Sequence, residues 1–187
     1  MNIISVVSNA MVELAHEYES ARGISPLYTM DAPSTGKAIY QAYQQACISG
    51  YFPVYADTSN GCIFGNECNL AYRFVHDIDH ALAYESGMGT TRLADEKRLN
   101  AQLCSRIYNI VFKAHGENTA LQAFFLLYAD TVGQSLNYAK TGEFVTDQIV
   151  FTSNLVLECK GYKLACAGNN ALAQQYRIAY LRECDAI

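Results

Sequence analysis

Apolar residues recur every three or four positions through most of the chain, which is the spacing of one face of an α-helix. The pattern is interrupted by glycine, proline and short polar runs, which are typical of helix ends. It predicts seven helices, over residues 2–20, 34–49, 67–86, about 90–114, 118–140, from Thr146 to near Gly161, and 170–184. We therefore expect an all-α fold, a single-domain helical bundle of about seven helices with short connections.

Three segments between these helices are predicted to be non-helical. Gly23 and Pro26 are expected to end the first helix. Residues 51–55 look extended, although their proline discourages a central strand because proline has no backbone N–H to donate. Residues 57–66 are rich in turn-forming residues and are expected to form a loop.

Length and composition fit one domain over residues 1–187, in which residues 72–151 carry the polar motifs. Hydrophobic residues make up 51% of the chain and charged residues only 17%, so a large core is expected. The net charge of −5 argues against direct nucleic-acid binding, which needs a basic surface. No apolar run approaches the roughly 20 residues of a membrane span. The seven cysteines lack structural zinc spacing, and the N-terminus lacks the basic region of a signal peptide, so we expect a cytoplasmic protein.

One short run combines two histidines with two carboxylates. It reads His76-Asp77-Ile78-Asp79-His80 and lies within an apolar helical stretch. Residues four apart on a helix share a face, so His76 and His80 can present both imidazoles to one ion. The apolar neighbours indicate burial, and a buried charge is costly unless it is paired or bound to metal.

Two later helices offer polar pairs that could meet the histidines. Glu96 and Asn100 are one turn apart on the fourth helix, and Asp130 and Gln134 are one turn apart on the fifth. Asp130 follows a strongly apolar run, which indicates that its carboxylate is buried. Gly133, beside this pair, would permit close approach of another helix. Polar pairs on facing helices are how bundles build metal sites in their cores.

The expected cofactor is a divalent metal ion. Imidazoles combined with carboxylates suit zinc, manganese or iron better than magnesium or calcium. The expected ligands are His76, His80, Glu96 and Asp130. Asp77 or Asp79 would act as a base, together with Glu96, or would orient an imidazole. The alternative is a hydrogen-bonded core pair or a partly exposed surface pair of histidines without an ion.

The run His76-Asp77, with His16 before it and Ala129-Asp130 after it, resembles the metal-binding signature of the HD-domain phosphohydrolases. These are all-helical enzymes that cleave phosphate esters of nucleotides. The resemblance implies a divalent metal held by an early histidine, the His-Asp doublet and a late aspartate. The alternative for His16 is a surface histidine on an acidic helix, and His115 reads as a helix-end residue.

A second resemblance covers residues 72 to 151 and leaves the first 70 residues outside. The pattern is similar to that of an uncharacterised family of small phage and plasmid proteins. The matching residues are Arg73-Phe74-Val75-His76-Asp77-x-x-His80, Glu96, Ala129-Asp130-Thr131-Val132-Gly133-Gln134, Tyr138, Phe144, Asp147-Gln148 and Phe151. This family implies a polar site and a bacterial host cytosol but no particular reaction.

Three functions are consistent with these observations. The first is a metal-dependent, HD-like hydrolase acting on a phosphoester or nucleotide, with Gln134, Tyr138 and Arg73 positioning the substrate. The second is a non-enzymatic phage-type protein that binds and inhibits a host factor, because the chain is small, acidic and rich in tyrosine, which is enriched at protein interfaces. The third is a non-haem iron enzyme, because two histidines and one carboxylate can form the facial triad of iron oxygenases. A homodimer is compatible with all three.

Overall fold

The computed structural model describes residues 2–59, 61–143 and 145–187 and is predominantly helical, which confirms the all-α prediction. Phe144, one of the motif residues, lies outside the described residues. Within the described chain the elements follow in the order α1 (Ile3–Arg22), β1 (Ser25–Thr29), α2 (Gly36–Ser49), β2 (Tyr51–Tyr55), α3 (Asn66–Glu85), α4 (Leu93–His115), α5 (Glu117–Thr141), α6 (Gln148–Glu158), α7 (Lys160–Cys166) and α8 (Asn170–Glu183).

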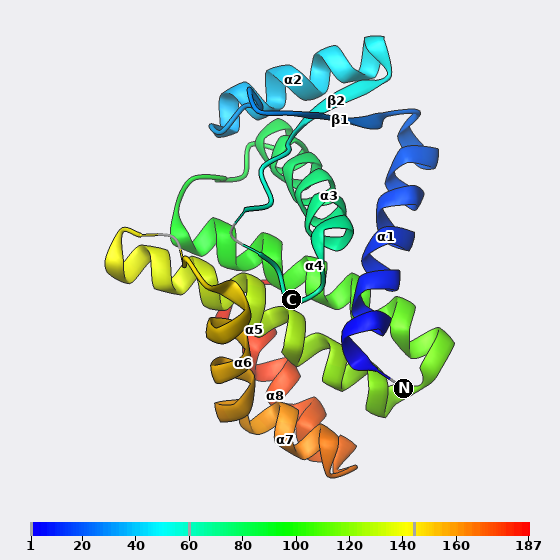
Figure 1. The fold of residues 1–187 in the computed structure, drawn as a ribbon, viewed down its shortest axis with the longest axis vertical. Helices are drawn as coiled ribbons and strands as arrows, with labels where there is room; N and C mark the ends of the chain where they lie inside the picture. Colours follow the sequence, from blue (N-terminus) through cyan, green and yellow to red (C-terminus); the bar gives the residue numbers. More distant parts are fainter. Residues whose placement is uncertain (1, 60, 144) are drawn as a thin grey trace.

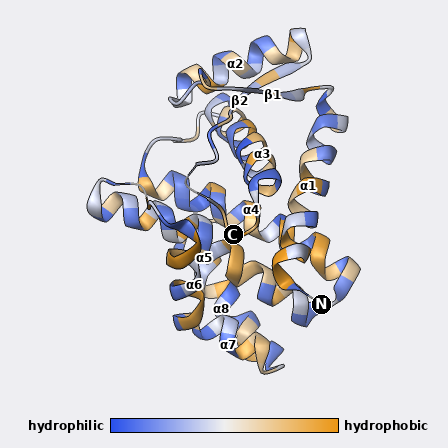
Figure 2. Ribbon diagram, viewed as in Figure 1, coloured by the Kyte–Doolittle hydropathy of each residue, from blue (hydrophilic) through white to orange (hydrophobic). Residues whose placement is uncertain are grey.

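The hairpin of α4 and α5 lies at the centre of the molecule (Figure 1). The strands, α2 and α3 lie toward one end, and α6, α7 and α8 lie toward the other. Helix α5 supplies much of the core, since Phe124 and Phe125 are completely buried and Leu127 almost so. Figure 2 shows that hydrophobic residues are frequent in the half of α1 near the N-terminus. The burial of these apolar side chains is the main force that holds the helices together.

The two strands form a parallel pair that the sequence revealed only in part. Residues 51–55 are extended as expected, but the strand at Ser25–Thr29 was missed, because its proline was taken only as a helix end. Pro53 is tolerated because a two-stranded sheet has no central strand. Helix α2 makes the crossover between the strands, and Phe52 packs edge-on against Phe74 of α3. The pair therefore anchors α3, which carries the histidines.

Several helix starts differ from the sequence prediction by one to three residues, and two of them show the physical reason. Helix α4 begins after Arg92 rather than after Thr90 or Thr91, because the buried Asp95 carboxylate accepts a hydrogen bond from the Arg92 backbone N–H (3.0 Å). Helix α6 begins after Asp147, whose side chain accepts from the backbone N–H of Val150, and not after Thr146. Both starts use a carboxylate, which also interacts favourably with the positive end of the helix dipole.

The predicted sixth helix is two helices, so the described chain has eight helices, in agreement with the expected bundle of about seven. The break is at Cys159, which has extended backbone angles of φ −67° and ψ 110°. The second piece, α7, packs closely on α5 at Gly161, where a Cβ atom would lie 2.3 Å from the Phe125 ring. Gly133 of α5 likewise allows Leu155 of α6 to approach, as the sequence had indicated. Within the described residues, no helix is both long and apolar enough to cross a membrane.

The contact at Gly161 predicts a large effect for a small substitution. Gly161→Ala should lower the free energy of unfolding by about 2 kcal/mol, because the added methyl overlaps a buried ring that has little space to move. Urea denaturation followed by circular dichroism measures this. The exposed Lys163→Ala on the same helix is the matched control and should change stability by less than about 0.5 kcal/mol. Equal stability of both variants would contradict the close packing of α7 on α5.

Candidate functional site

The site is built where α3 faces α4. His76 and His80 lie one turn apart on α3, and both imidazoles point their Nε2 atoms at the carboxylate of Glu96 on α4. The distance from His76 Nε2 to Glu96 Oε2 is 3.2 Å, and that from His80 Nε2 to Glu96 Oε1 is 3.0 Å. The two Nε2 atoms are 3.2 Å apart, and the rings are almost perpendicular. Three potential metal ligands therefore converge on one point.

These separations match those of ligands that share an ion. Atoms held about 2.1 Å from zinc are roughly 3.0 Å apart at octahedral angles and roughly 3.4 Å apart at tetrahedral angles. In the cluster the two Nε2 atoms are 3.2 Å apart, and each lies 3.0 to 3.2 Å from a different oxygen of the Glu96 carboxylate. Among the described residues, His76, His80 and Glu96 are the one group of three or more such side chains close enough to hold a metal ion.

The charges in the cluster stabilise one another. Burial by itself raises the pKa of Glu96, but hydrogen bonds and positive charge from His76 and His80 outweigh it and bring the pKa well below its ordinary value. Burial lowers the pKa of His76, but Glu96 outweighs this effect and the net pKa lies above the ordinary 6.5. Glu96 therefore remains an anion, and protons compete with any cation for the imidazoles.

Apart from Glu96, the two imidazoles have few contacts with described residues that fix the orientation of their rings. The Nδ1 atoms of His76 and His80 are buried, and no described residue forms a hydrogen bond with them. The Tyr72 ring stacks on His76, with centroids 5.1 Å apart and planes inclined by 14°. The hydroxyl of Tyr72 donates to Asn100 Oδ1 at 2.7 Å. Stacking and the Glu96 carboxylate thus orient the rings, because nothing described fixes them through Nδ1.

A cavity of about 800 Å³ opens beside this cluster. His76 and Glu96 line it, whereas His80 is only 5% exposed and is not among the lining residues. Asp130 and Gln134 of α5 line the same cavity. The volume falls in the range of small-molecule sites, which is roughly 300–1,000 Å³. The structure therefore brings both predicted polar pairs to one cavity, with the cluster in its wall.

Asp130 belongs to the cavity but not to the ligand group. Its Oδ1 atom accepts hydrogen bonds from Thr152 Oγ1 (2.6 Å) and Gln134 Nε2 (3.2 Å). Burial raises the pKa of this carboxyl, and the two hydrogen bonds oppose the rise only in part. The predicted set of four ligands is therefore reduced to three in this structure, with Asp130 held separately by α6.

The two aspartates between the histidines have different environments. Asp79 is buried away from the cavity, where its carboxylate accepts a hydrogen bond from Tyr18 (2.7 Å) and forms an ion pair with Arg106. This contact joins α3 to α1 and α4. Asp77 is half-buried, and burial raises its pKa to about 6 against the opposing charges of His76 and His80. Neither carboxylate lines the cavity.

The predicted substrate-binding residues also differ in their contacts. Gln134, Tyr138 and Arg73 all line the cavity. The Arg73 guanidinium, however, donates to the backbone oxygens of Tyr55 (2.8 Å) and Asp57 (2.5 Å). Arg73 therefore holds the segment after β2 against α3, while Gln134 and the 45% exposed Tyr138 reach the cavity.

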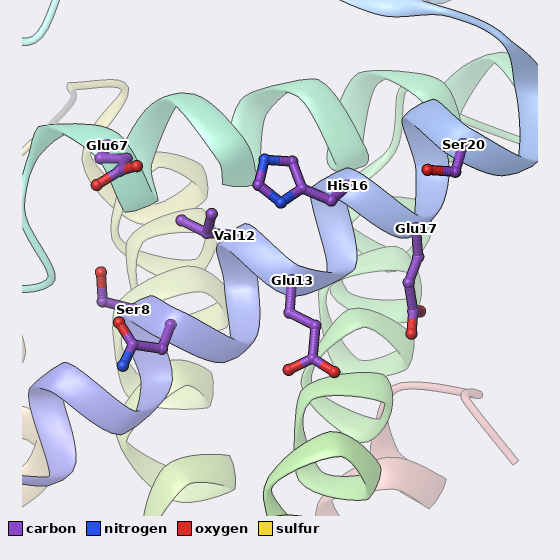
Figure 3. Close-up of a pocket in the computed structure, with 8 residues that line it drawn as sticks. Ser8, Val12, Glu13, His16, Glu17, Ser20 and Glu67 are labelled. Atoms are coloured by element: carbon purple, nitrogen blue, oxygen red, sulfur yellow. The ribbon is translucent and has the colours of Figure 1, made fainter.

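His16 is not brought to the cluster. It lies on the exposed face of α1, in an open groove with Glu13 and Glu67, and Figure 3 shows its ring and the Glu13 carboxylate pointing in different directions. The structure therefore does not assemble the early histidine of the HD-domain signature with His76. His115 is the exposed last residue of α4, as the sequence indicated.

Sequence reasoning missed several residues that shape the site. Tyr72 lies one turn before His76, so helical spacing could have identified it. The partners of Asp79, namely Tyr18 and Arg106, come from other helices and leave no local signal. Thr152 reaches Asp130 from α6 for the same reason.

The environment of Asp79 predicts a structural role. Arg106→Leu should lower the free energy of unfolding by about 2–3 kcal/mol, because it leaves a buried carboxylate without its cation. Adding Asp79→Asn to that variant removes the stranded charge and should restore most of the stability. Chemical denaturation measures both effects, and elemental analysis should show the same metal content in Asp79→Asn as in the unmodified protein. Loss of metal in Asp79→Asn would instead make Asp79 part of the site.

Comparison with known proteins does not assign a function to this site. No model of a protein family matches the chain, and neither the curated proteins nor the solved structures gave a significant match. The function is therefore argued from the His76, His80 and Glu96 cluster and the cavity beside it.

Proposed function

We propose that the protein binds a divalent metal ion through His76, His80 and Glu96, and that the ion serves a hydrolytic reaction in the adjacent cavity. The observation that carries this proposal is the convergence of two Nε2 atoms, 3.2 Å apart, on the Glu96 carboxylate, which has one oxygen 3.2 Å from His76 and the other 3.0 Å from His80. Two histidines and a glutamate form a ligand set used by zinc hydrolases, and three protein ligands leave a position open for water.

The open position on the ion would be accessible from the cavity. Because His76 and Glu96 line the cavity, an ion between them would be accessible to a small molecule there. The ion would lower the pKa of its bound water and stabilise negative charge on the substrate. Glu96 would remain a charged ligand because the ion would replace the positive charge that the imidazoles otherwise supply, and Asp77 would act indirectly through the field at the imidazoles.

A phosphoester or nucleotide remains the proposed substrate. Arg73 is the one cationic side chain among the described lining residues besides the histidine, and its Nη1 atom already donates to two backbone oxygens. The ion would therefore supply the positive charge that a phosphoryl group needs. Zinc, manganese and iron all suit the ligand set, and iron would favour oxygen chemistry in place of hydrolysis.

A second candidate function is binding to another protein, such as a factor of a bacterial host. It is favoured by large apolar side chains that lie exposed on or just after the strands. These are Leu27 (54% exposed), Tyr28 (50%), Met30 (62%) and Tyr51 (60%). Exposed apolar groups that gather in one region are typical of interaction surfaces. This function does not need the histidines, so it would survive their replacement.

Removal of the histidines should abolish metal binding. The purified protein is expected to hold about one divalent ion per chain, and His76→Ala and His80→Ala should each lower its affinity at least 100-fold, because two ligands remain in each variant. Elemental analysis and calorimetric titration with Zn²⁺ and Mn²⁺ measure this.

His115→Ala, at the exposed end of α4, is the matched control and should bind metal as the unmodified protein does. The metal proposal fails if the unmodified protein takes up no ion at neutral pH. It fails equally if the His76 and His80 variants retain one.

Metal binding should weaken as the pH falls. The pKa of His76 lies above 6.5, and an imidazole must lose its proton at Nε2 before it can bind an ion there. We expect the association constant to fall about tenfold for each pH unit below that pKa and to level off above it. Calorimetric titration between pH 5.5 and 8.5 tests this, and an affinity that does not change over the range would rule out His76 as a ligand.

A further inference from the structure

A second set of polar groups faces the cavity from α5. Asp130 lines the cavity, is 7% exposed, and accepts both of its hydrogen bonds at Oδ1. The described residues donate no hydrogen bond to its Oδ2 atom. Because Asp130 lines the cavity, this atom can accept a hydrogen bond from a ligand that enters there.

Gln134 extends this set by one helical turn. Its Nε2 atom donates to Asp130 Oδ1, which fixes the side-chain amide beside the carboxyl group. Its own Oε1 atom accepts no hydrogen bond from the described residues. Thr152, which donates to Asp130 from α6, holds the carboxyl group from the other side. The cavity therefore presents two neighbouring oxygens, Asp130 Oδ2 and Gln134 Oε1, on side chains that hydrogen bonds hold in place.

The remaining walls favour an uncharged, planar ligand. Phe64, Tyr72 and Tyr138 line the cavity and provide aromatic faces. Arg73 also lines the cavity, but its Nη1 atom donates to the backbone oxygens of Tyr55 and Asp57. A phosphate group beside Asp130 would meet another acidic group, whereas a flat heterocycle could stack and hydrogen-bond along its edge.

We propose that Asp130 and Gln134 form a recognition subsite for an uncharged heterocycle of the nucleobase type, separate from the metal ligands. The ring edge would hydrogen-bond to Asp130 Oδ2 and Gln134 Oε1, and an aromatic side chain of the cavity would cover its face. The inference rests on the proposed function only in taking this cavity as the substrate site. It places a ring at α5 and leaves the reacting bond at His76 and Glu96.

The subsite can be tested without metal. Adenosine, guanosine, cytidine and uridine are titrated by calorimetry into the full chain in the presence of EDTA, with inorganic phosphate as a further probe. We expect at least one nucleoside to bind and inorganic phosphate not to bind. Gln134→Leu and Asp130→Leu, checked for folding by circular dichroism, should each weaken nucleoside binding about tenfold, because each removes a hydrogen bond.

Gln45→Leu, on an exposed position of α2 outside the cavity, is the matched control and should leave binding unchanged. The inference is overturned if none of the four nucleosides binds, or if folded Gln134→Leu binds as well as the unmodified protein. EDTA removes divalent ions, so the nucleoside titration does not depend on the metal site. Metal binding is measured separately by elemental analysis, so the two proposals can fail independently.

Discussion

The site depends on one carboxylate placed between two imidazoles. Glu96 brings a negative charge from α4 to the face of α3 that carries His76 and His80, and it lies 3.0 to 3.2 Å from their Nε2 atoms. A half-buried carboxylate is stable there because the imidazoles donate hydrogen bonds and positive charge to it. The same arrangement gives an ion three ligand atoms without a change in the fold. Helix α3 is in turn positioned by its contacts with the strand pair and with α1.

Four neighbouring carboxylates acquire different properties from their partners. Asp79 is neutralised by Arg106 and joins helices, whereas Glu96 is held ionised by histidines. Burial dominates at Asp77 and Asp130 and raises the pKa of each. Residue type and spacing therefore do not determine what an acidic side chain does in this protein. The role of each carboxylate depends instead on the charged or polar groups that other helices bring to it.

The helices and part of the site follow from local pattern. Helical spacing placed His76 with His80 and Asp130 with Gln134, because residues four apart share a face. It also indicated Gly133 as a point of close approach, and this approach allows α6 to carry Thr152 to Asp130. The break at Cys159 was missed, and the strand at Ser25–Thr29 was missed because its pairing partner is distant in sequence. For the same reason the pattern could not show that Asp79 turns toward Arg106 or that Asp130 stands apart from the histidines.

The most direct measurement is a crystal structure of the protein grown with Zn²⁺ or Mn²⁺, with diffraction recorded on both sides of the absorption edge of the metal. The account predicts one anomalous peak about 2.0–2.2 Å from the Nε2 atoms of His76 and His80 and from an oxygen of Glu96, facing the cavity that Asp130 and Gln134 also line. A peak elsewhere, or a fully ordered cluster without a peak, would contradict it.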